Sequence, residues 1–403
     1  MPTLYAPWLE ALVGAPMPDE AAATCHTCAM LAPAGAIADA SALHFHPATK
    51  CCTYVPVLPN FLVGRILADR SAGNATGRAS LIARMADRAT VTPLGVDPPP
   101  AYTLTYERSA ADLFGRAPGL RCPHYLADSG GCGIWRHRMS VCATWFCKHD
   151  RGAVGHAFWN AVRDLLAAVE RALAVHCVQT LAPSPEAARL AVARRRPAPV
   201  TVTPANAGGA LPPAYEQQWG RYSGREAAFF DDCARLVGSL TWDDVQRLGG
   251  AEIALAADVV RQSHRALRTD SLPTAPRQGT LTVYAIDGAA ATCTGYSGTD
   301  PLQLPIPLLQ VMRVFDGRPL PRALAAARAA GVEVDADAVR RLVDFGMLEE
   351  TDGGPTGRPR RVRRPSARST ETPMAAKKPA KKVRVKDMKP AKSIKGGAAK
   401  KAY

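Results

Sequence analysis

The cysteines constrain this chain more than any other residue type. Eleven are spread over 403 residues, and eight of them fall into pairs or close groups. Residues 121–151 hold four of the eight, and the spacers between them carry turn formers such as Ser129, Gly130 and Gly131 instead of a helical or alternating apolar pattern. A segment with so few core-forming side chains needs a staple. The eight grouped cysteines are Cys25, Cys28, Cys51, Cys52, Cys122, Cys132, Cys142 and Cys147.

The compartment decides what these thiols do. The first residues, MPTLYAPWLEALVG, lack the basic segment and apolar core of a signal peptide, and no apolar run is long enough to span a bilayer. We therefore expect a cytoplasmic chain with no membrane partner. Thiols stay reduced in the cytoplasm, so the cluster favours metal binding or redox chemistry, with a disulfide framework as the alternative.

Eight thiolates match two four-sulfur sites, or one polynuclear cluster with extra ligands. The Cys-x2-Cys spacing of Cys25 and Cys28 lets both sulfurs reach one tetrahedral metal at about 2.3 Å. The adjacent Cys51 and Cys52 point to opposite faces of an extended segment, so they serve different metals or different edges of one cluster. The sequence predicts a site for Zn²⁺ or an iron–sulfur cluster and leaves the choice open.

Residues around the eight cysteines complete this prediction. His44 and His46 share one face if their segment is extended, and they are further candidate ligands. The isolated Cys177, Cys233 and Cys293 are expected to be small buried hydrophobes. Because thiolate sites carry negative charge, positive neighbours are expected around them. The basic residues of the central stretch are Arg121, Arg136, Arg138, Lys148 and Arg151.

The apolar pattern predicts an α+β, mainly helical chain. Apolar residues recur at close to helical period over residues 153–177, and Asp287-Gly288 between two alternating runs indicates a β-hairpin. The expected parts are a metal-stapled cysteine domain at 1–180 with an insertion at 71–106, a linker at 181–214, a helical region at 215–270, a winged-helix-like domain at 279–352 and a basic tail at 353–403.

The net charge of the chain belongs to its tail. Residues 355–403 contain seventeen Lys and Arg against two acidic residues, whereas residues 1–354 contain thirty-three of each sign. With almost no apolar residues the tail is expected to be disordered. Its KKPAKK pattern resembles linker-histone tails, so we expect salt-sensitive attraction to nucleic acid or an acidic partner. A purely solubilising tail is the alternative.

The cysteine motifs also resemble a known family. Cys-x2-Cys, a Cys-Cys pair and the later C-P-x-Y and G-G-C-x-I-W-x-x-R-x-x-x-C-x-x-x-x-C are similar to YkgJ-type cysteine-cluster proteins over about residues 24–150. The family core appears as CGIWRHRMSVC, with Trp135 and Met139 where Tyr and Pro are usual, and the gap between Cys28 and Cys51 is longer than usual. The resemblance implies that the cysteines hold Zn²⁺ or an iron–sulfur cluster. It implies no reaction.

A second resemblance concerns residues 279–352. The FDGR and LVDFGML segments and the order of the elements resemble winged-helix-like domains of the PqqD or peptide-recognition kind, which implies a protein or peptide partner. A docking or dimerising domain without a ligand is the alternative.

Three functions follow from these features. The first is a metal-binding protein whose cluster is structural or redox-active and whose C-terminal domain and tail contact a macromolecule. No nucleophile and base at readable spacing, phosphate-binding glycine loop or His-Glu protease motif stands in residues 151–354. The second is a metal-dependent modifying or redox enzyme, because the motifs resemble those of flagellin lysine methylases, although a glycine-rich methyl-donor loop is missing. The third is a nucleic-acid-associated regulatory protein.

Overall fold

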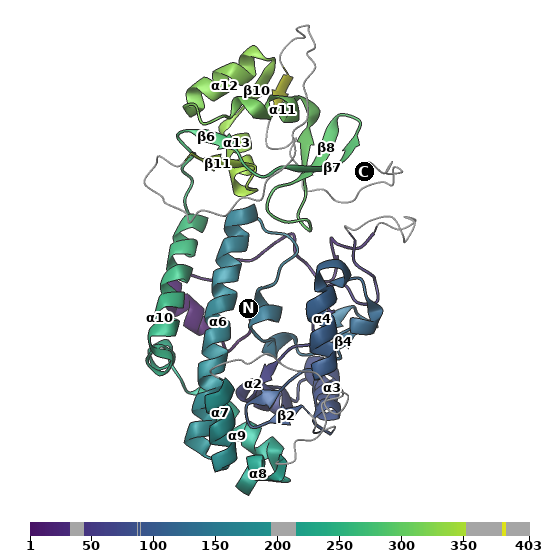
Figure 1. Ribbon diagram of the computed structural model, residues 1–403, viewed down its shortest axis with the longest axis vertical. Helices are drawn as coiled ribbons and strands as arrows, with labels where there is room; N and C mark the ends of the chain where they lie inside the picture. Colours follow the sequence, from purple (N-terminus) through teal and green to yellow (C-terminus); the bar gives the residue numbers. More distant parts are fainter. Residues whose placement is uncertain (33–43, 87, 89, 195–214, 352–380, 384–403) are drawn as a thin grey trace. The chain divides into compact units, whose positions relative to one another are not determined.

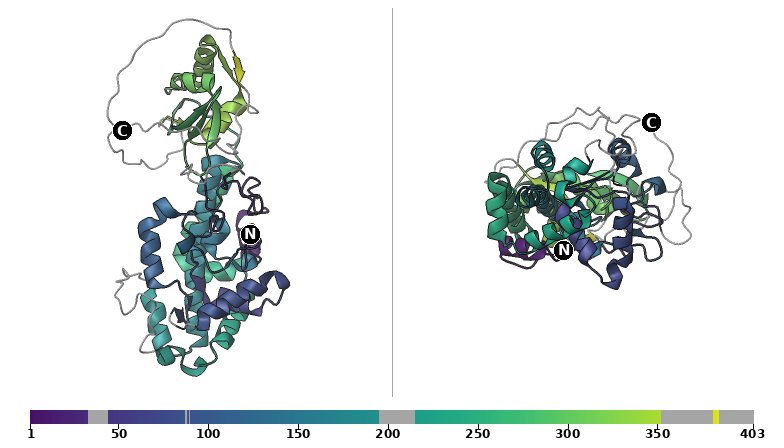
Figure 2. Two further views of the ribbon diagram at one scale, coloured as in Figure 1. Left: turned by 90° about the vertical axis from the view of Figure 1, so that its right-hand side faces the viewer. Right: turned by 90° about the horizontal axis from the view of Figure 1, so that it is seen from below.

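The computed structural model describes residues 1–32, 44–86, 88, 90–194, 215–351 and 381–383. Two compact units are present. The first contains Met1–Cys147 and Ala157–Ala266, and the second contains Lys148–His156 and the described residues from Leu267 onward. Helices dominate and the sheets are small (Figures 1 and 2), so the prediction of a mainly helical α+β chain is confirmed.

The first unit is built mostly from helices. They are α1 (Ala6–Val13), α2 (Asn60–Ala68), α3 (Ala75–Ala86), α4 (Pro100–Leu113), α5 (Ser140–Thr144), α6 (Gly152–Leu181), α7 (Pro185–Arg194), α8 (Tyr215–Trp219), α9 (Glu226–Gly238) and α10 (Trp242–Leu267). Of these, residues 152–156 of α6 and Leu267 of α10 belong to the second unit. Its short 3₁₀ helices are η1 (Ala72–Asn74), η2 (Pro118–Leu120), η3 (Trp135–His137) and η4 (Gly220–Tyr222). Its strands form an antiparallel sheet in the order β1 (Leu58–Pro59), β3 (Gly95–Val96), β2 (Val91–Thr92), and a separate antiparallel pair, β4 (Tyr125–Leu126) and β5 (Gly131–Cys132).

Helix α6 supplies the centre of the first unit's core. Phe158, Val162, Leu165, Val169 and Leu173 are fully buried on it, at the spacing that the sequence predicts. Burying one such side chain contributes about 1.5–3 kcal/mol. The apolar stripe therefore explains why this long segment is a stable helix.

Helices α2 and α9 pack closely. A Cβ on Gly64 would lie 1.9 Å from the carbonyl oxygen of Phe230, so only glycine allows the two backbones to approach this far. Helix α10 begins after Thr241, whose hydroxyl accepts a hydrogen bond from the Asp244 N–H at 3.3 Å. Non-helical backbone at Gly250 kinks α10.

The second unit joins small sheets to short helices. An antiparallel sheet has the order β7 (Thr282–Asp287), β8 (Ala290–Thr294), β9 (Leu302–Pro305), and β6 (Pro276–Gln278) pairs with β11 (Leu348–Glu350). The helices are α11 (Ile306–Val311), η5 (Met312–Val314), α12 (Leu320–Ala329) and α13 (Ala336–Asp344). Gly288, with φ +57°, makes the predicted hairpin turn between β7 and β8.

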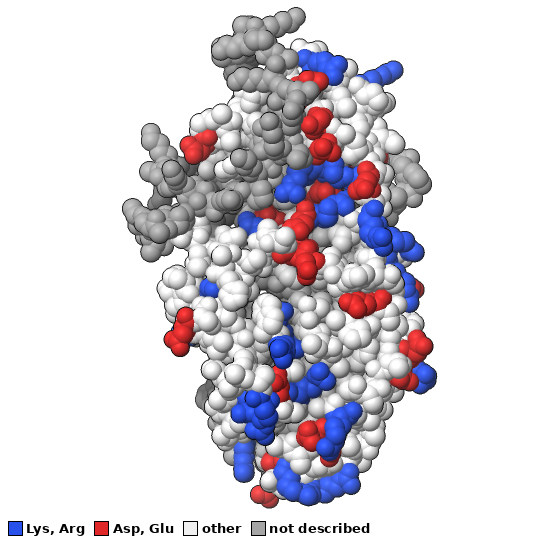
Figure 3. All heavy atoms as spheres, turned by 180° about the vertical axis from the view of Figure 1, so that it is seen from behind, with Lys and Arg blue, Asp and Glu red and all other residues white. Residues whose placement is uncertain are grey.

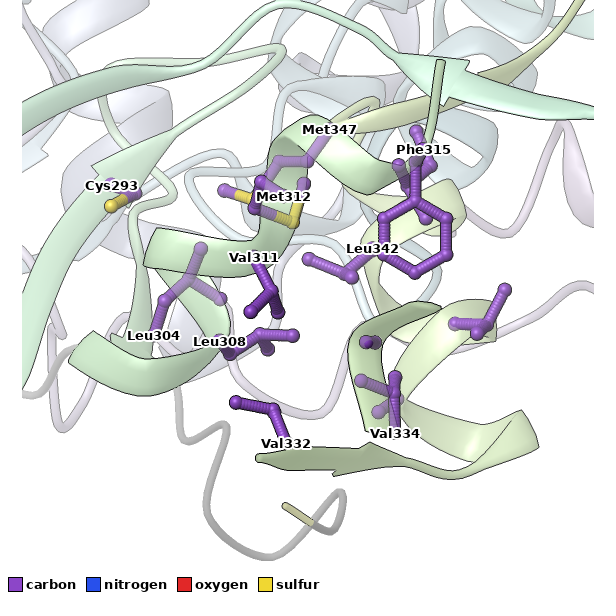
Figure 4. Close-up of a cluster of buried hydrophobic side chains, with 14 of the residues drawn as sticks. Cys293, Leu304, Leu308, Val311, Met312, Phe315, Val332, Val334, Leu342 and Met347 are labelled. Carbon is purple, nitrogen blue, oxygen red and sulfur yellow. The ribbon is translucent and has the colours of Figure 1, made fainter. Parts of the chain in front are cut away.

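The core of this unit is apolar and continuous (Figure 4). Leu304 and Leu308 lie beside Val311 and Met312, and Leu342 of α13 faces them. The whole cluster takes side chains from three α-helices and three sheets, so the unit has a hydrophobic core of its own.

Two segments differ from the sequence prediction. Pro93 and residues 98–100 predict a connector within the 71–106 insertion, but this part contains the β2–β3 hairpin and the start of α4. Proline at the first position of a helix costs no hydrogen bond, so the Pro-rich run can begin α4. In the tail that we predict to be disordered, residues Lys381–Val383 form β12, parallel to β10 (Val332–Val334). The prediction is wrong for these three residues, because β10 is a strand whose backbone groups accept a further strand. The rest of the tail, and residues 195–214 of the linker, lie outside the described residues.

Candidate metal centre formed by the cysteines

The eight grouped cysteines all belong to the first unit, on segments of different kinds. Cys25, Cys28, Cys51, Cys52, Cys122 and Cys147 lie outside helices and strands, Cys132 is in β5 and Cys142 is in α5. None of these eight described cysteines is in a disulfide. Their positions depend on turns and short elements, as the sequence predicts for the central stretch.

The thiols converge. Negative charge on Cys52 raises the pKa of Cys25, Cys122, Cys132 and Cys142, although burial is the larger cause for each of them. These sulfurs therefore lie within electrostatic reach of one another.

The remaining members join the same group through packing. Cys147 is buried with Met30 and Phe45, and Cys28 and Cys51 pack against that cluster. The fold thus gathers cysteines from both ends of residues 25–147.

The vicinal pair contains the most acidic thiol of the group for which a shift is resolved. The Cys51 thiol donates a hydrogen bond to Cys52, which raises the pKa of Cys51, and burial and the charges of Cys52, Cys25 and Cys147 raise it further. The same hydrogen bond lowers the pKa of Cys52, and Lys50 and Arg138 lower it as well, against the effect of burial. Cys52 is therefore the first of the two to be a thiolate.

Lys50 ties three cysteine-bearing segments together. Its Nζ donates to the carbonyl oxygens of Cys25 at 2.7 Å and Gly130 at 2.9 Å, and it directly precedes Cys51. Its φ of +48° lies in the left-handed region, which costs energy for a residue with a Cβ. The strained backbone and the buried ammonium together mark Lys50 as a candidate functional residue.

Arg138 is the second positive group at the cysteines. Its Nη1 donates to the carbonyl oxygen of Cys142 at 3.1 Å, and its guanidinium stacks on Trp135 at 3.4 Å from the ring centre. Burial lowers its pKa, and the charges of Cys132 and Cys142 oppose that effect. The guanidinium therefore offsets part of the negative charge that thiolates would bring.

Backbone hydrogen bonds hold the later cysteines against the earlier ones. The N–H of Cys122 donates to the carbonyl oxygen of Cys52 at 2.8 Å, and Cys132 is paired with Tyr125 in the β4–β5 ladder. Burial raises the pKa of Cys122 to about 12 and that of Cys132 to about 11. These thiols stay protonated at neutral pH unless a cation takes the place of the proton.

Glu170 of α6 positions the helix that carries Cys142. Its carboxylate accepts hydrogen bonds from the Ser140 N–H at 2.6 Å, the Ser140 hydroxyl at 2.7 Å and the Tyr5 hydroxyl at 2.7 Å. Burial raises its pKa to about 7, against the effect of these donors. Sequence analysis missed Glu170, although a signal exists: it lies four residues after Leu166, on the apolar face of α6.

Three tyrosines lie within electrostatic reach of Cys142. Tyr102 and Tyr106 of α4 are stacked with ring centres 6.0 Å apart, and Tyr54 meets Tyr106 edge-on at 5.4 Å. The charge of Cys142 contributes to the raised pKa of each of the three, of which burial is the largest cause. The sequence offered no signal for this row, because α4 was not predicted.

The structure corrects the role of two basic residues. Lys148 and Arg151 were expected among the cysteines, but Lys148 lies 3.8 Å from Asp300 and Arg151 lies 2.8 Å from Asp344, all in the second unit. Proximity in sequence suggested the wrong partners, because the chain passes from one unit to the other after Cys147.

The other candidates divide as follows. The backbone N–H of Ala48 donates to Nδ1 of the exposed His46 at 3.1 Å, and the carbonyl oxygen of His44 accepts a hydrogen bond from Arg116. Neither contact supports a role of either imidazole as a metal ligand.

The isolated cysteines lie in hydrophobic cores. Cys177 and Cys233 are fully buried beside each other, and the distance from Sγ of Cys177 to the carbonyl oxygen of Cys233 is 3.9 Å. Cys293 is fully buried in the core of the second unit. The expectation that these three are buried is confirmed.

The donor chemistry of the eight cysteines fits a thiophilic cation. Two of the eight uncrosslinked thiols are buried and six are half-buried. Such thiols, with an acidic member, an ammonium and a guanidinium beside them, are the surroundings that Zn²⁺ and iron–sulfur clusters need. In the described part of the chain, however, no three His, Cys, Asp or Glu side chains are arranged as ligands of one ion. Cation binding would therefore draw the sulfurs closer together.

Comparisons with family models, curated proteins and solved structures found no match to this chain. Among the described residues, no helix combines the length and the apolar character needed to cross a membrane.

Proposed function

We propose that this chain is a metal-binding protein whose eight grouped cysteines hold Zn²⁺ or an iron–sulfur cluster. The observation that carries the proposal is the convergence of four separate cysteine-bearing segments in one unit without a disulfide. Thiols of raised pKa gain no hydrogen bonding from lying next to one another that would explain why eight cysteines are grouped. A cation would replace their protons and bind the segments together.

The ligands are Cys25, Cys28, Cys51, Cys52, Cys122, Cys132, Cys142 and Cys147, the set that the YkgJ-type resemblance also implies. Zn²⁺ would act as a structural cross-link, and an iron–sulfur cluster would add electron transfer. In either case Lys50 and Arg138 offset negative charge, and Glu170 holds the short helix of Cys142 in place.

The row of three tyrosines favours a redox-active cluster as the second candidate. Tyr54, Tyr102 and Tyr106 give an aromatic path next to Cys142, a feature that a purely structural zinc site does not use. An enzyme built on such a cluster remains a proposal of the same kind.

Partner binding is proposed for the second unit and the tail. Within residues 148–156 and 267–351 there are ten basic and eleven acidic residues, and the two signs are interspersed on the face shown in Figure 3. A nucleic-acid surface would need a basic patch. The winged-helix-like residues 279–352 therefore fit a protein or peptide better than nucleic acid, and attraction to nucleic acid is assigned to residues 355–403.

Elemental analysis with an absorption spectrum, on full-length protein purified without oxygen, tests the proposal. Colourless protein with about two Zn²⁺ per chain supports two four-thiolate sites. Iron with sulfide and a broad absorption that bleaches on reduction supports the cluster.

A matched pair of variants gives the control. Cys142→Ser removes a proposed ligand and should lower metal content, whereas Cys233→Ser changes a buried thiol away from the group and should leave it unchanged. Metal-free wild-type protein, or equal loss in both variants, would refute the assignment.

A further inference from the structure

Strand β10 is fixed in place by the core of the second unit. Val332 and Val334 point from it into the hydrophobic cluster of that unit (Figure 4), and helices α11 and α12 pack against it. Glu333 stands between the two valines, and alternate residues of a strand point to opposite faces. The side chains therefore hold β10 against its own unit, while its backbone N–H and carbonyl groups are left to pair along the edge.

The strand that pairs with β10 comes from the basic tail. Among the described residues β12 is its one strand partner, and the two strands run parallel. The paired positions are Val332 with Lys381, Glu333 with Lys382 and Val334 with Val383. Strand β12 thus satisfies backbone groups of β10 that would otherwise bond to water.

The paired segment is the part of the tail whose sequence suits a strand. Residues 382–386 read KVRVK, so basic and β-branched residues alternate there. Pro379 precedes this segment and Pro390 follows it, and proline cannot donate to a sheet. The pairing therefore begins where the sequence of the tail itself favours a strand.

The register also sets opposite charges across from each other. Lys382 stands opposite Glu333, the acidic residue of β10. The Glu333 side chain lies 3.4 Å from Arg328 and is still 39% exposed. Opposite charges at paired positions of neighbouring strands stabilise a sheet, and like charges destabilise it. The edge of β10 therefore favours a segment with a basic residue at this position.

We propose that the edge of β10 is a peptide-docking site, and that its occupant is the tail of the same chain, bound through residues 381–383. The site takes an extended segment with a basic residue opposite Glu333 and an apolar residue opposite Val334. The inference rests on the partner binding proposed for the second unit and involves no metal. A peptide partner of residues 279–352 that uses this site shares the chemistry of the tail and competes with it.

The connection between the two strands favours the chain's own tail over the tail of a second copy. A pairing of three residues is weak on its own. A segment linked to its site meets it at an effective concentration on the order of millimolar, whereas a second copy competes only at the concentration of the protein. Covalent linkage therefore makes a short strand a sufficient ligand.

Hydrogen exchange at residues 332–334 tests the docking, because hydrogen-bonded amides exchange slowly. Truncation of the chain after residue 354 removes β12. We expect exchange at the paired amides of β10 to become faster by about tenfold or more, since only their opening protects them. Strand β8 of the same unit is the internal control, and its exchange should not change.

Charge-reversal variants of the full-length chain test the register. Glu333→Lys and Lys382→Glu each set like charges opposite each other, and each should speed exchange at residues 332–334 by up to about fivefold. The double variant should restore the slow exchange. Glu349→Lys on β11 and Lys378→Glu in the tail make the same charge changes outside the register, and they should leave this exchange unchanged.

A free peptide tests the chemistry that the site accepts. The peptide AKKVRVKD, which is residues 380–387, is added to the truncated chain at a concentration on the order of millimolar, to match the linked tail. It should slow exchange at residues 332–334 again. The peptide AVVKKKRD has the same composition without the alternation, and it should have no effect.

Equal exchange at residues 332–334 in the full-length and truncated chains would overturn the docking site. Protection that disappears on dilution of the full-length chain would assign the strand to a second copy and overturn the intramolecular occupant. Equal effects of the two peptides would overturn the selectivity for alternating residues. A chain that holds neither Zn²⁺ nor iron would instead overturn the metal site of the proposed function, and these exchange results would stand.

Discussion

Glu170 makes the stability of the first unit depend on pH in a way that one substitution should remove. Its carboxyl is fully enclosed, and burial raises its pKa from 4.5 to about 7. The substitution Glu170→Gln keeps the shape of the side chain: the new amide oxygen can accept from the Ser140 N–H and the Tyr5 hydroxyl, and the amide nitrogen can donate to the Ser140 hydroxyl oxygen. The variant therefore changes the charge and little else.

The magnitude follows from the raised pKa. A carboxyl whose pKa is higher in the folded chain stabilises it fully below pH 4.5, and that contribution is lost as pH rises through about 7. At about 1.36 kcal/mol per pKa unit, the loss is about 3 kcal/mol above pH 8. Part of this loss has already occurred at pH 5, so we expect Glu170→Gln to gain about 2.5 kcal/mol in unfolding free energy relative to wild type between pH 5 and pH 8.5.

Urea unfolding followed by tryptophan fluorescence suits this measurement, because all six tryptophans belong to the first unit. Both proteins are measured at each pH with reductant and chelator present. Histidine titrations are common to the two proteins, so they cancel in the difference between their unfolding free energies. Glu170→Ala serves as the second variant. It leaves the buried donors of Tyr5 and Ser140 unsatisfied, at about 1–3 kcal/mol for each donor, and should be destabilised at both pH values. A difference between Glu170→Gln and wild type that does not change with pH would refute the argument.

Three further predictions test packing, the ammonium at the cysteines and the tail. Gly64→Ala should destabilise the first unit by about 3 kcal/mol or more, because its Cβ would overlap the Phe230 carbonyl oxygen, whereas Gly73→Ala, with nothing within 4 Å, should not; urea unfolding compares the two. Lys50→Met should cost about 2 kcal/mol, since two carbonyl oxygens lose a charged donor, and should lower metal content; equal metal content would argue against its role. Truncation after residue 354 should abolish retention on heparin at low salt, and surviving retention would show that the folded units bind as well.

Local patterns predicted the elements whose signal is short-range. The Asp287-Gly288 turn and the apolar period of α6 were both visible in the sequence, because a hairpin turn and an amphipathic stripe depend on neighbouring residues. Helix α4 lacks such a local signal. Its Pro-rich start favours a connector, and the helix has no buried residue that would give it an apolar stripe.

The candidate site was predictable in composition and not in arrangement. Grouping of the cysteines separated the eight from Cys177, Cys233 and Cys293, and the structure places these three elsewhere. No local signal foretells that Lys50 adopts a positive φ and reaches Cys25 and Gly130, because that contact joins segments 25 and 80 residues away.

The partners of Lys148 and Arg151 show why the whole chain is needed for experiments on the cysteines. A fragment ending near residue 270 would keep all eight thiols but would remove Asp300 and Asp344, leaving the basic groups next to Cys147 without their carboxylates. A fragment ending at Cys147 would lose Ala157–Ala266, which belong to the same compact unit, and with them Glu170. A metal assay on the shorter fragment would therefore test the eight cysteines without a large part of the unit that carries them.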